Sequence, residues 1–260
     1  MDESLLVLAF ISANCGLKWL LSYTTKKSDH CPHDVFLENY FKDKKNSVEI
    51  VGYGSLMSPI SAKGTFPSLR NFKTVRVYGY RRVFSVPGSI FFDHEIANYD
   101  EKQFAGLTAE KADGYSFLAA AFTIEENYDN FLRRENTYSF AEVPYEEVPN
   151  KAPGTGLMCI SSTDDIYISR WGLERFNALY TSRGVYTIWG WGEDSGIQPC
   201  WVYLRHCVLS ARQLSQEAYD SFLDETYLVD RSTTIRRYLE EHPEVMRALP
   251  PEGLMGRYSG

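Results

Sequence analysis

One acidic residue, Glu135, stands on the apolar face of a predicted helix in this sequence. Residues Ile124–Asn136 are predicted to form that helix. At 100° per residue, three of its apolar side chains cluster close to the direction of Ile124, and Glu135 falls at about 20° from it, in the middle of the same face. These three apolar side chains belong to Tyr128, Phe131 and Leu132. The pattern therefore aims a carboxylate at the protein interior.

Burying an unpaired carboxylate costs several kcal/mol, so such a group needs a partner or a chemical role. A carboxylate in a pocket is suited to general acid–base catalysis. Two other readings remain open. The helix could fray before Glu135, or a cation such as Arg81, Arg82 or another basic residue could pair with it.

A glycine-rich segment is the second feature with chemical potential. Gly52-Tyr53-Gly54-Ser55-Leu56 follows a predicted strand at Val48–Tyr53 and opens a predicted loop that runs to Pro67. Glycines let the backbone approach a ligand closely, and successive N–H groups can bind an anion. The segment lacks the features of a dinucleotide fingerprint, a Walker loop and a GxSxG elbow. A plain strand-to-loop turn is the alternative.

Taken together, the two features resemble the γ-glutamylcyclotransferase-like superfamily. The glycine-rich segment is similar to its substrate-binding loop, which reads GYGSL in ChaC-type members. The segment Tyr78–Phe84 is similar to the G-x-x-R-R-F-like strand that follows, and Phe131–Asn136 is similar to the setting of the catalytic glutamate. Tyr138 and the valine-rich run Val143–Val148 come next, as they do in the family. The chain departs from the family at Asn136-Thr137, where glycines are usual, and in its helical C-terminal half.

The resemblance implies an enzyme that cyclises a γ-glutamyl group to 5-oxoproline and releases an amine or amino acid. It implies Glu135 as the general base, Gly52, Tyr53, Gly54, Ser55 and Leu56 as the substrate-binding loop, and a small γ-glutamyl compound as the partner. Tyr138 would contact the glutamyl group, or would be a packed strand tyrosine. The reaction calls for no metal and no organic cofactor. A catalytically silent binding module and a γ-glutamylamine-cleaving relative are the alternatives.

The elements expected to position these residues are strands first and helices later, which indicates an α+β fold. We expect a small mixed β-barrel of the γ-glutamylcyclotransferase-like type, covered by C-terminal helices. The expected divisions are an extension and linker at 1–46, the barrel core at 47–160 and a helical portion at 161–260 packed on the same domain. Further strands are expected at Phe72–Val86, Ile90–Ile96, Gln103–Thr108, Ser116–Thr123, Tyr138–Val148 and Leu157–Ser161, and the clearest helices at Ser215–Tyr227 and Thr233–Glu241.

Composition narrows the class of protein. Lys and Arg number 27 against 34 Asp and Glu, giving a net charge of −7, so the broad basic surface of a nucleic-acid binder is missing. Aromatic residues make up 15% of the chain, which favours strands and a lined pocket. The 5 cysteines form no CxxC pair, and His30-Cys31-Pro32-His33 has no distant partner pair for a metal. We expect reduced thiols in a cytoplasmic protein.

The N-terminal stretch differs from the rest of the chain in its apolar character. Leu5–Ile11 is apolar and the stretch continues weakly to Leu21, which is short of the ~20 apolar residues that span a bilayer. Asp2 and Glu3 do not suit the basic start of a signal peptide. We expect a terminal helix or a loose extension and no membrane partner, with a leader or anchor as the alternative. The sequence does not indicate an oligomeric state.

Overall fold

The structure is a computed structural model that describes residues 32–45, 47–125 and 128–259. The apolar N-terminal stretch, His30 and Cys31 lie outside the described residues. None of the helices in the described ranges has the length and apolar character needed to cross a membrane. The helices are α1 Pro32–Asp43, α2 Pro59–Thr65, α3 Ser89–Asp93, α4 Tyr128–Arg134, α5 Asp164–Trp171, α6 Leu173–Leu179, α7 Trp201–Leu214, α8 Gln216–Asp224, α9 Ile235–Glu241 and α10 Met255–Tyr258, with 3-10 turns η1 Ser55–Met57, η2 Thr181–Arg183, η3 Glu193–Ser195, η4 Pro243–Arg247 and η5 Glu252–Leu254.

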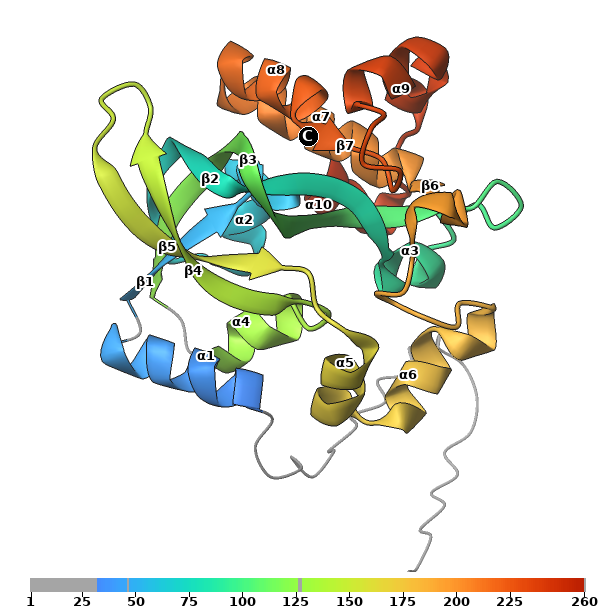
Figure 1. Cartoon of the computed structure of the whole chain (residues 1–260), viewed down its shortest axis with the longest axis horizontal. Coiled ribbons are helices and arrows are strands. Elements are labelled where there is room, and N and C mark those ends of the chain that lie inside the picture. The colour runs from blue at the N-terminus through green and yellow to red at the C-terminus, as the bar shows by residue number, and fades with distance from the viewer. Residues whose placement is uncertain (1–31, 46, 126–127, 260) are drawn as a thin grey trace, which may run out of the picture.

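A mixed barrel forms the centre of the molecule (Figure 1). Its strands are β1 Ser47–Gly52, β2 Arg70–Pro87, β3 Gln103–Glu125, β4 Ser139–Glu147 and β5 Pro153–Ile160. They pair in the order β3-β1-β5-β4-β2, and a further pairing of β2 with β3 closes the ring. The β1–β5 pair is parallel and the other four are antiparallel. Two short strands pair in parallel with the long ones: β6 Gln198–Pro199 pairs with β3, and β7 Thr226–Tyr227 pairs with β2. The α+β fold with a small mixed barrel, predicted from the sequence, is confirmed.

Strands β2 and β3 are longer than the sequence suggested. The two strands predicted at 103–108 and 116–123 are parts of the single strand β3, because the polar residues between them continue the pairing with β2. The ladder changes register between Tyr78 and Tyr80, and the intervening Gly79 has a φ of 78°. A residue at that φ is favourable only as glycine, so Gly79 allows the bulge that bends β2 around the barrel.

Four predictions of local structure were wrong. Residues 90–96, predicted as a strand, contain the helix α3, whose Phe91 and Phe92 pack into the core. The predicted loop at 54–67 contains η1 and α2. The predicted linker before residue 46 contains α1, whose Leu37 and Phe41 are buried. The predicted helix 124–136 is shorter, because its first two residues complete β3 and α4 ends at Arg134.

The C-terminal helices cover one side of the barrel, while α1, α4, α5 and α6 lie on the other side in Figure 1. Polar residues begin several of these helices, as their sequences require. Ser58 caps α2, Thr163 caps α5, Ser215 caps α8 and Thr234 caps α9, each through a side-chain oxygen that accepts a backbone N–H. One hydrophobic cluster runs from the barrel interior into the helices, so the helical portion shares the core of the barrel.

Candidate active site

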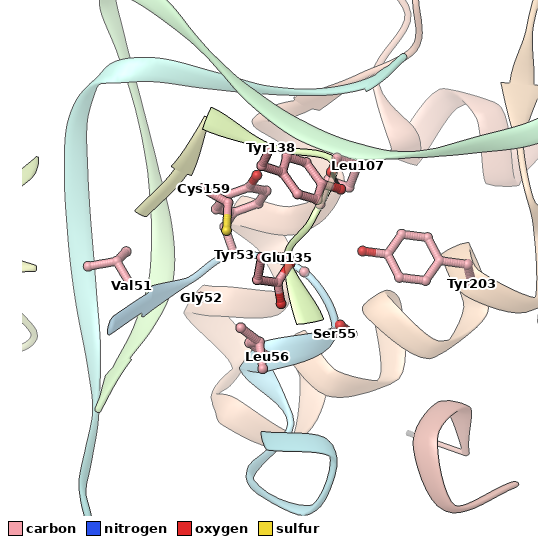
Figure 2. A pocket seen from close by; sticks show the side chains of 11 residues that line it. Val51, Gly52, Tyr53, Ser55, Leu56, Leu107, Glu135, Tyr138, Cys159 and Tyr203 are labelled. Atoms are coloured by element: carbon pink, nitrogen blue, oxygen red, sulfur yellow. Dashed lines mark hydrogen bonds between the residues drawn. The ribbon is translucent and has the colours of Figure 1, made fainter. Parts of the chain in front are cut away.

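A cavity of about 40 Å³ lies where β1 leaves the barrel, next to the start of β4 and to α7. Figure 2 shows its lining, which comes from five separate stretches of the chain. The lining residues are Val51, Gly52, Tyr53, Gly54, Ser55, Leu56, Leu107, Glu135, Tyr138, Cys159 and Tyr203. All the candidate residues singled out in the sequence therefore border this one cavity. Glu135 is the only one of the eleven whose side chain is acidic or basic by type.

The glycine-rich segment forms one wall of the cavity. Its two glycines are required by close packing rather than by a left-handed backbone. A Cβ at position 52 would lie 2.5 Å from the Cβ of Leu56, and one at position 54 would lie 2.8 Å from the hydroxyl of Tyr203. The backbone then turns into η1, where the N–H of Met57 donates to the carbonyl of Gly54 at 2.9 Å.

Within this turn, the backbone N–H groups of Ser55 and Leu56 have no hydrogen-bond partner among the described residues. A buried or half-buried N–H without a partner costs free energy, so these two donors favour an acceptor from a ligand. Successive free N–H groups form the type of concave donor set that binds carboxylates and oxyanions. The wall is therefore suited to an anionic group.

Glu135 follows directly after the last residue of α4. Because the helix ends at Arg134, the two neighbouring side chains can meet, which they could not do inside a helix. The Nε of Arg134 donates to Oε1 of Glu135 at 2.7 Å, and the side chains are only 6% and 14% exposed. Arg134 also donates to the hydroxyl of Thr65. The cation that accompanies the buried carboxylate is thus Arg134, and not Arg81 or Arg82.

Arg81 and Arg82 belong to other parts of the protein. Arg81 pairs with Glu110 on the neighbouring strand at 2.5 Å. The buried guanidinium of Arg82 donates to the carbonyl oxygens of Leu118 and Ser221 at 3.0 and 2.8 Å. Burial lowers the pKa of Arg82 to about 9. This side chain joins α8 to the barrel. The residues to which it donates, Leu118 and Ser221, do not line the cavity.

Tyrosines and one thiol fill much of the remaining lining. Burial raises the pKa of Tyr53, Tyr138 and Tyr203 well above the ordinary value, so all three are neutral hydroxyls at physiological pH. Tyr138 donates its hydroxyl to the carbonyl of Leu107 at 2.9 Å. Burial, reinforced by the nearby Glu135 carboxylate, also raises the pKa of Cys159, so this residue is a protonated thiol and not a nucleophile.

Four lining residues were not predicted as site residues from the sequence: Val51, Leu107, Cys159 and Tyr203. Tyr203 comes from α7, and Figure 2 shows its hydroxyl directed into the cavity. The ring is held by Phe84, Phe91 and Tyr258 at centroid distances of 6.2, 5.3 and 5.6 Å. A tyrosine on a helix 68 residues beyond Glu135 gives no local signal of its position.

His206 and Cys207 of α7 lie behind the wall of the cavity. Both are buried, and Cys207 Sγ would lie 3.8 Å from a Cβ at position 54. Burial lowers the pKa of His206 to about 4 and raises that of Cys207 to about 12, so both are uncharged at neutral pH. An uncharged thiol beside an uncharged imidazole is not the activated pair that a Cys–His nucleophile requires.

In the described residues no group of three or more His, Cys, Asp and Glu side chains is placed to hold a metal ion. The fold and the cavity thus define a small α+β barrel protein in which a paired glutamate faces a glycine-rich turn. The polar side chains that line this cavity are one carboxylate, four hydroxyls and one protonated thiol.

Similarity to known proteins is found among solved structures. No family model matches the sequence, and no curated protein matches it. Among solved structures, the chain is similar to a γ-glutamyl cyclotransferase, with a TM-score of 0.42 and 10% identity over 82% of this chain and 92% of that chain. It is similar to the same extent, 0.42, to a yeast γ-glutamyl cyclotransferase specific to glutathione, with 14% identity over 77% of this chain and 96% of that one.

A human protein described as uncharacterized is similar over 52% of this chain and 86% of its own, with a TM-score of 0.36 and 14% identity. These are likenesses in fold, and at these identities no activity is carried over from them. The function has to be argued from the cavity itself.

Proposed function

We propose that this protein is a γ-glutamylcyclotransferase-like enzyme that cyclises the γ-glutamyl group of a small compound to 5-oxoproline and releases an amine or amino acid. The observation that carries the proposal is that Glu135 and the Tyr53–Leu56 turn line the same cavity. A carboxylate that can take a proton there stands opposite free backbone donors that can bind an anion. These are the two groups that such a cyclisation requires.

The reaction begins with the α-ammonium group of the substrate, which must lose a proton before its nitrogen can attack. Arg134 holds Oε1 of Glu135, so Oε2 is the oxygen that accepts this proton. The freed α-amine attacks the γ-carbonyl carbon of the same glutamyl group, a C–N bond forms, and the carbonyl oxygen becomes an oxyanion. The attack is intramolecular, so holding the glutamyl chain folded supplies a large part of the rate.

Once the C–N bond has formed, the attacking nitrogen is cationic and loses its second proton to water. The oxyanion then collapses, the bond to the departing nitrogen breaks, and Glu135 returns its proton to that nitrogen. The products are 5-oxoproline, the free amine and one proton, which the amine takes up at neutral pH, with no net change in protons on the protein. The N–H groups of Ser55 and Leu56 would bind the α-carboxylate or the oxyanion, because both are anionic and the donors are otherwise free. The reaction in this form needs no metal or organic cofactor.

The neutral hydroxyls of Tyr53, Tyr138 and Tyr203 are suited to hydrogen bonding with the polar groups of the substrate. A phenol can donate a hydrogen bond to a carboxylate without adding a charge, and each of these three is kept protonated by burial. Tyr138 already donates to Leu107, so its oxygen is left as an acceptor for the substrate amine. We therefore assign Tyr138 to amine binding and Tyr203 to the carboxylate or carbonyl side.

A substrate panel tests the proposal. The protein is incubated with glutathione, with γ-glutamyl amino acids and with γ-glutamyl-lysine amides, and 5-oxoproline, free glutamate and bound ligand are measured for each. Release of 5-oxoproline from at least one compound is expected. Glutamate in its place would indicate hydrolysis by water and contradict intramolecular attack. Binding without any turnover would indicate a silent binding module on the same fold.

The same panel separates the leaving groups. Preference for glutathione or γ-glutamyl amino acids indicates an amino-acid leaving group, and preference for the lysine amides indicates the γ-glutamylamine-cleaving alternative. Either preference is compatible with the proposed chemistry, because Glu135 and the turn act on the glutamyl half that all the compounds share.

A further inference from the structure

The short segment that carries Glu135 and Tyr138 is held from outside the barrel by α5 and the turn at residues 187–191. We propose that Arg170 and Trp171 of α5 are positioning residues that fix this segment, so that the carboxylate of Glu135 keeps its place in the cavity. The inference rests on the proposed function for its effect on catalysis, but its structural part can be tested without any substrate. It assigns a task to the helical portion of the chain that no sequence motif identified.

Two side chains at the end of α5 reach the backbone immediately after Glu135. The indole Nε1 of Trp171 donates to the carbonyl of Asn136 at 2.8 Å. The Nη1 of Arg170 donates to the carbonyl of Tyr138 at 2.9 Å and to that of Asn136 at 3.4 Å. These carbonyls belong to a turn, not to the barrel ladder, so they would otherwise lack protein partners. The contacts tie the backbone on each side of residue 137 to one helix.

The two donors are themselves held in place by cation–π contacts. The guanidinium of Arg170 lies over the ring of Phe140, 5.7 Å from its centre. The ring of Trp171 is covered by the guanidinium of Arg175 at 4.8 Å. A donor whose own position is fixed by packing loses little freedom when it makes its hydrogen bond, so it can position a partner effectively.

The ring of Tyr138 is fixed by the second element, the turn at residues 187–191. Trp189 packs edge-on against it at a centroid distance of 5.7 Å. The turn is anchored to the first residue of α5, because Asp164 accepts the N–H groups of Ile188 and Trp189, both at 2.9 Å, and the hydroxyl of Thr187 at 2.6 Å. The first residue of α5 therefore holds the turn that packs against Tyr138, and its last two residues hold the backbone of the segment itself.

The hydrogen bonds that Asn136 and Thr137 make with their side chains are local to the segment. The Asn136 amide donates to the carbonyl of Arg133 at 3.0 Å, and the Thr137 hydroxyl donates to Asn136 Oδ1 at 3.2 Å. These bonds fold the turn locally, but they do not connect it to the rest of the protein. Arg170 and Trp171 supply that connection.

A misplacement of a catalytic group by about 1 Å can lower a rate by about 100-fold. Loss of one of the hydrogen bonds would loosen the segment only in part, so we expect Trp171→Phe to lower kcat roughly 10-fold, with KM changed less than about threefold. Phenylalanine keeps an aromatic ring for Arg175 to cover and removes the N–H donor. Arg170→Lys keeps the positive charge but replaces the planar guanidinium with an ammonium group, and it should also lower kcat.

The test combines kinetics with hydrogen exchange in the full-length protein. The amide of Glu135 donates to the carbonyl of Phe131, and the amide of Tyr138 donates to that of Glu135. The exchange rates of these two amides therefore report the opening of the segment. Trp171→Phe should speed that exchange about fivefold, as expected for the loss of one hydrogen bond. The matched control is Trp201→Phe, which removes an indole donor to Tyr238 at 3.0 Å elsewhere in the fold. The control should leave exchange at 135–138 unchanged.

Faster exchange at these amides together with a fall in kcat at nearly constant KM supports the inference. Unchanged exchange in both Trp171→Phe and Arg170→Lys overturns it, as does an equal effect of the Trp201→Phe control. If the wild-type protein releases no 5-oxoproline from any compound, the proposed function fails and exchange alone decides whether α5 holds the segment. The two failures are therefore distinguishable.

Discussion

A single methyl group added at Gly54 should destabilise the protein and close the cavity. A Cβ at this position would lie 2.8 Å from the hydroxyl oxygen of Tyr203 and 3.4 Å from a methyl carbon of Leu107. The first contact is too short, so one of the two groups has to move. The ring of Tyr203 is packed against Phe91 and Tyr258, which leaves it little room to turn away.

Overpacking of a dense interior costs about 1–3 kcal/mol. For a protein of this size a loss of 1 kcal/mol lowers the melting temperature by about 2–4 °C, so Gly54→Ala should lower it by roughly 3–10 °C. The same methyl would occupy space that the substrate needs, so we expect kcat/KM for 5-oxoproline release to fall more than 10-fold, an order-of-magnitude expectation for a misplaced substrate. Thermal unfolding and the product assay measure the two effects separately.

Gly64 provides the matched control. It lies in α2, and an added Cβ there would meet nothing within 4 Å. Because alanine is favoured over glycine inside a helix by about 1 kcal/mol, Gly64→Ala should leave the melting temperature unchanged or raise it slightly. It should also leave activity unchanged, since the added methyl points into open space.

A second substitution tests the cause of the Gly54 effect. Tyr203→Phe removes the hydroxyl that the new methyl would strike, so the Gly54→Ala/Tyr203→Phe double variant should recover at least half of the stability lost by Gly54→Ala. Such recovery is a coupling between two sites in contact. A Gly54→Ala protein as stable as the wild type, or a double variant in which the two losses simply add, would refute this account of the cavity wall.

Three further outcomes follow from the described contacts. Arg134→Leu removes the cation from the buried Glu135 and should lower the free energy of unfolding by about 3–5 kcal/mol, as measured in urea; Glu135→Gln in the same chain should reduce the loss. His206 is uncharged in the folded state, with its pKa lowered by burial to about 4 from 6.5, so the unfolded chain binds the extra proton and stability falls as the pH drops from about 6.5 to about 4. That fall, about 3 kcal/mol for this group, should be absent from the pH profile of His206→Asn, and an identical profile would contradict it. Ser221→Ala leaves the N–H of Leu118 without its acceptor at 2.8 Å and should lower the free energy of unfolding by about 1–3 kcal/mol.

The parts of the site that the sequence predicted are those coded locally. Gly52–Leu56 is a continuous segment at the end of a strand, and Gly52 is needed because of its contact with Leu56 in the same segment. Glu135 was placed correctly toward the interior even though the predicted helix was too long. The last turn of α4 keeps the spacing from Phe131 to Glu135, and the N–H of Glu135 still donates to the carbonyl of Phe131 at 3.0 Å.

The parts that the sequence did not predict depend on where secondary structure ends or on distant packing. Arg134 reaches Glu135 only because α4 stops between them, and helix ends are the least predictable feature of a sequence. Residues 90–96 are apolar enough for a strand, but Gly88 and the buried Phe91 and Phe92 lead the chain into a short helix. Tyr203 enters the cavity because α7 packs against η1, a contact between segments about 150 residues apart that no local pattern encodes.

The central claim is that Glu135 acts as the proton acceptor in an intramolecular cyclisation. The most direct measurement is the rate of 5-oxoproline release by Glu135→Gln beside the wild type and Glu125→Gln, a matched control whose carboxylate is 51% exposed and paired with Arg70 on the surface. The amide keeps the shape of the side chain and removes the base. General-base catalysis contributes about 100- to 10,000-fold, so Glu135→Gln should lose activity by at least about 100-fold while Glu125→Gln retains it. Undiminished 5-oxoproline release by Glu135→Gln would contradict the account.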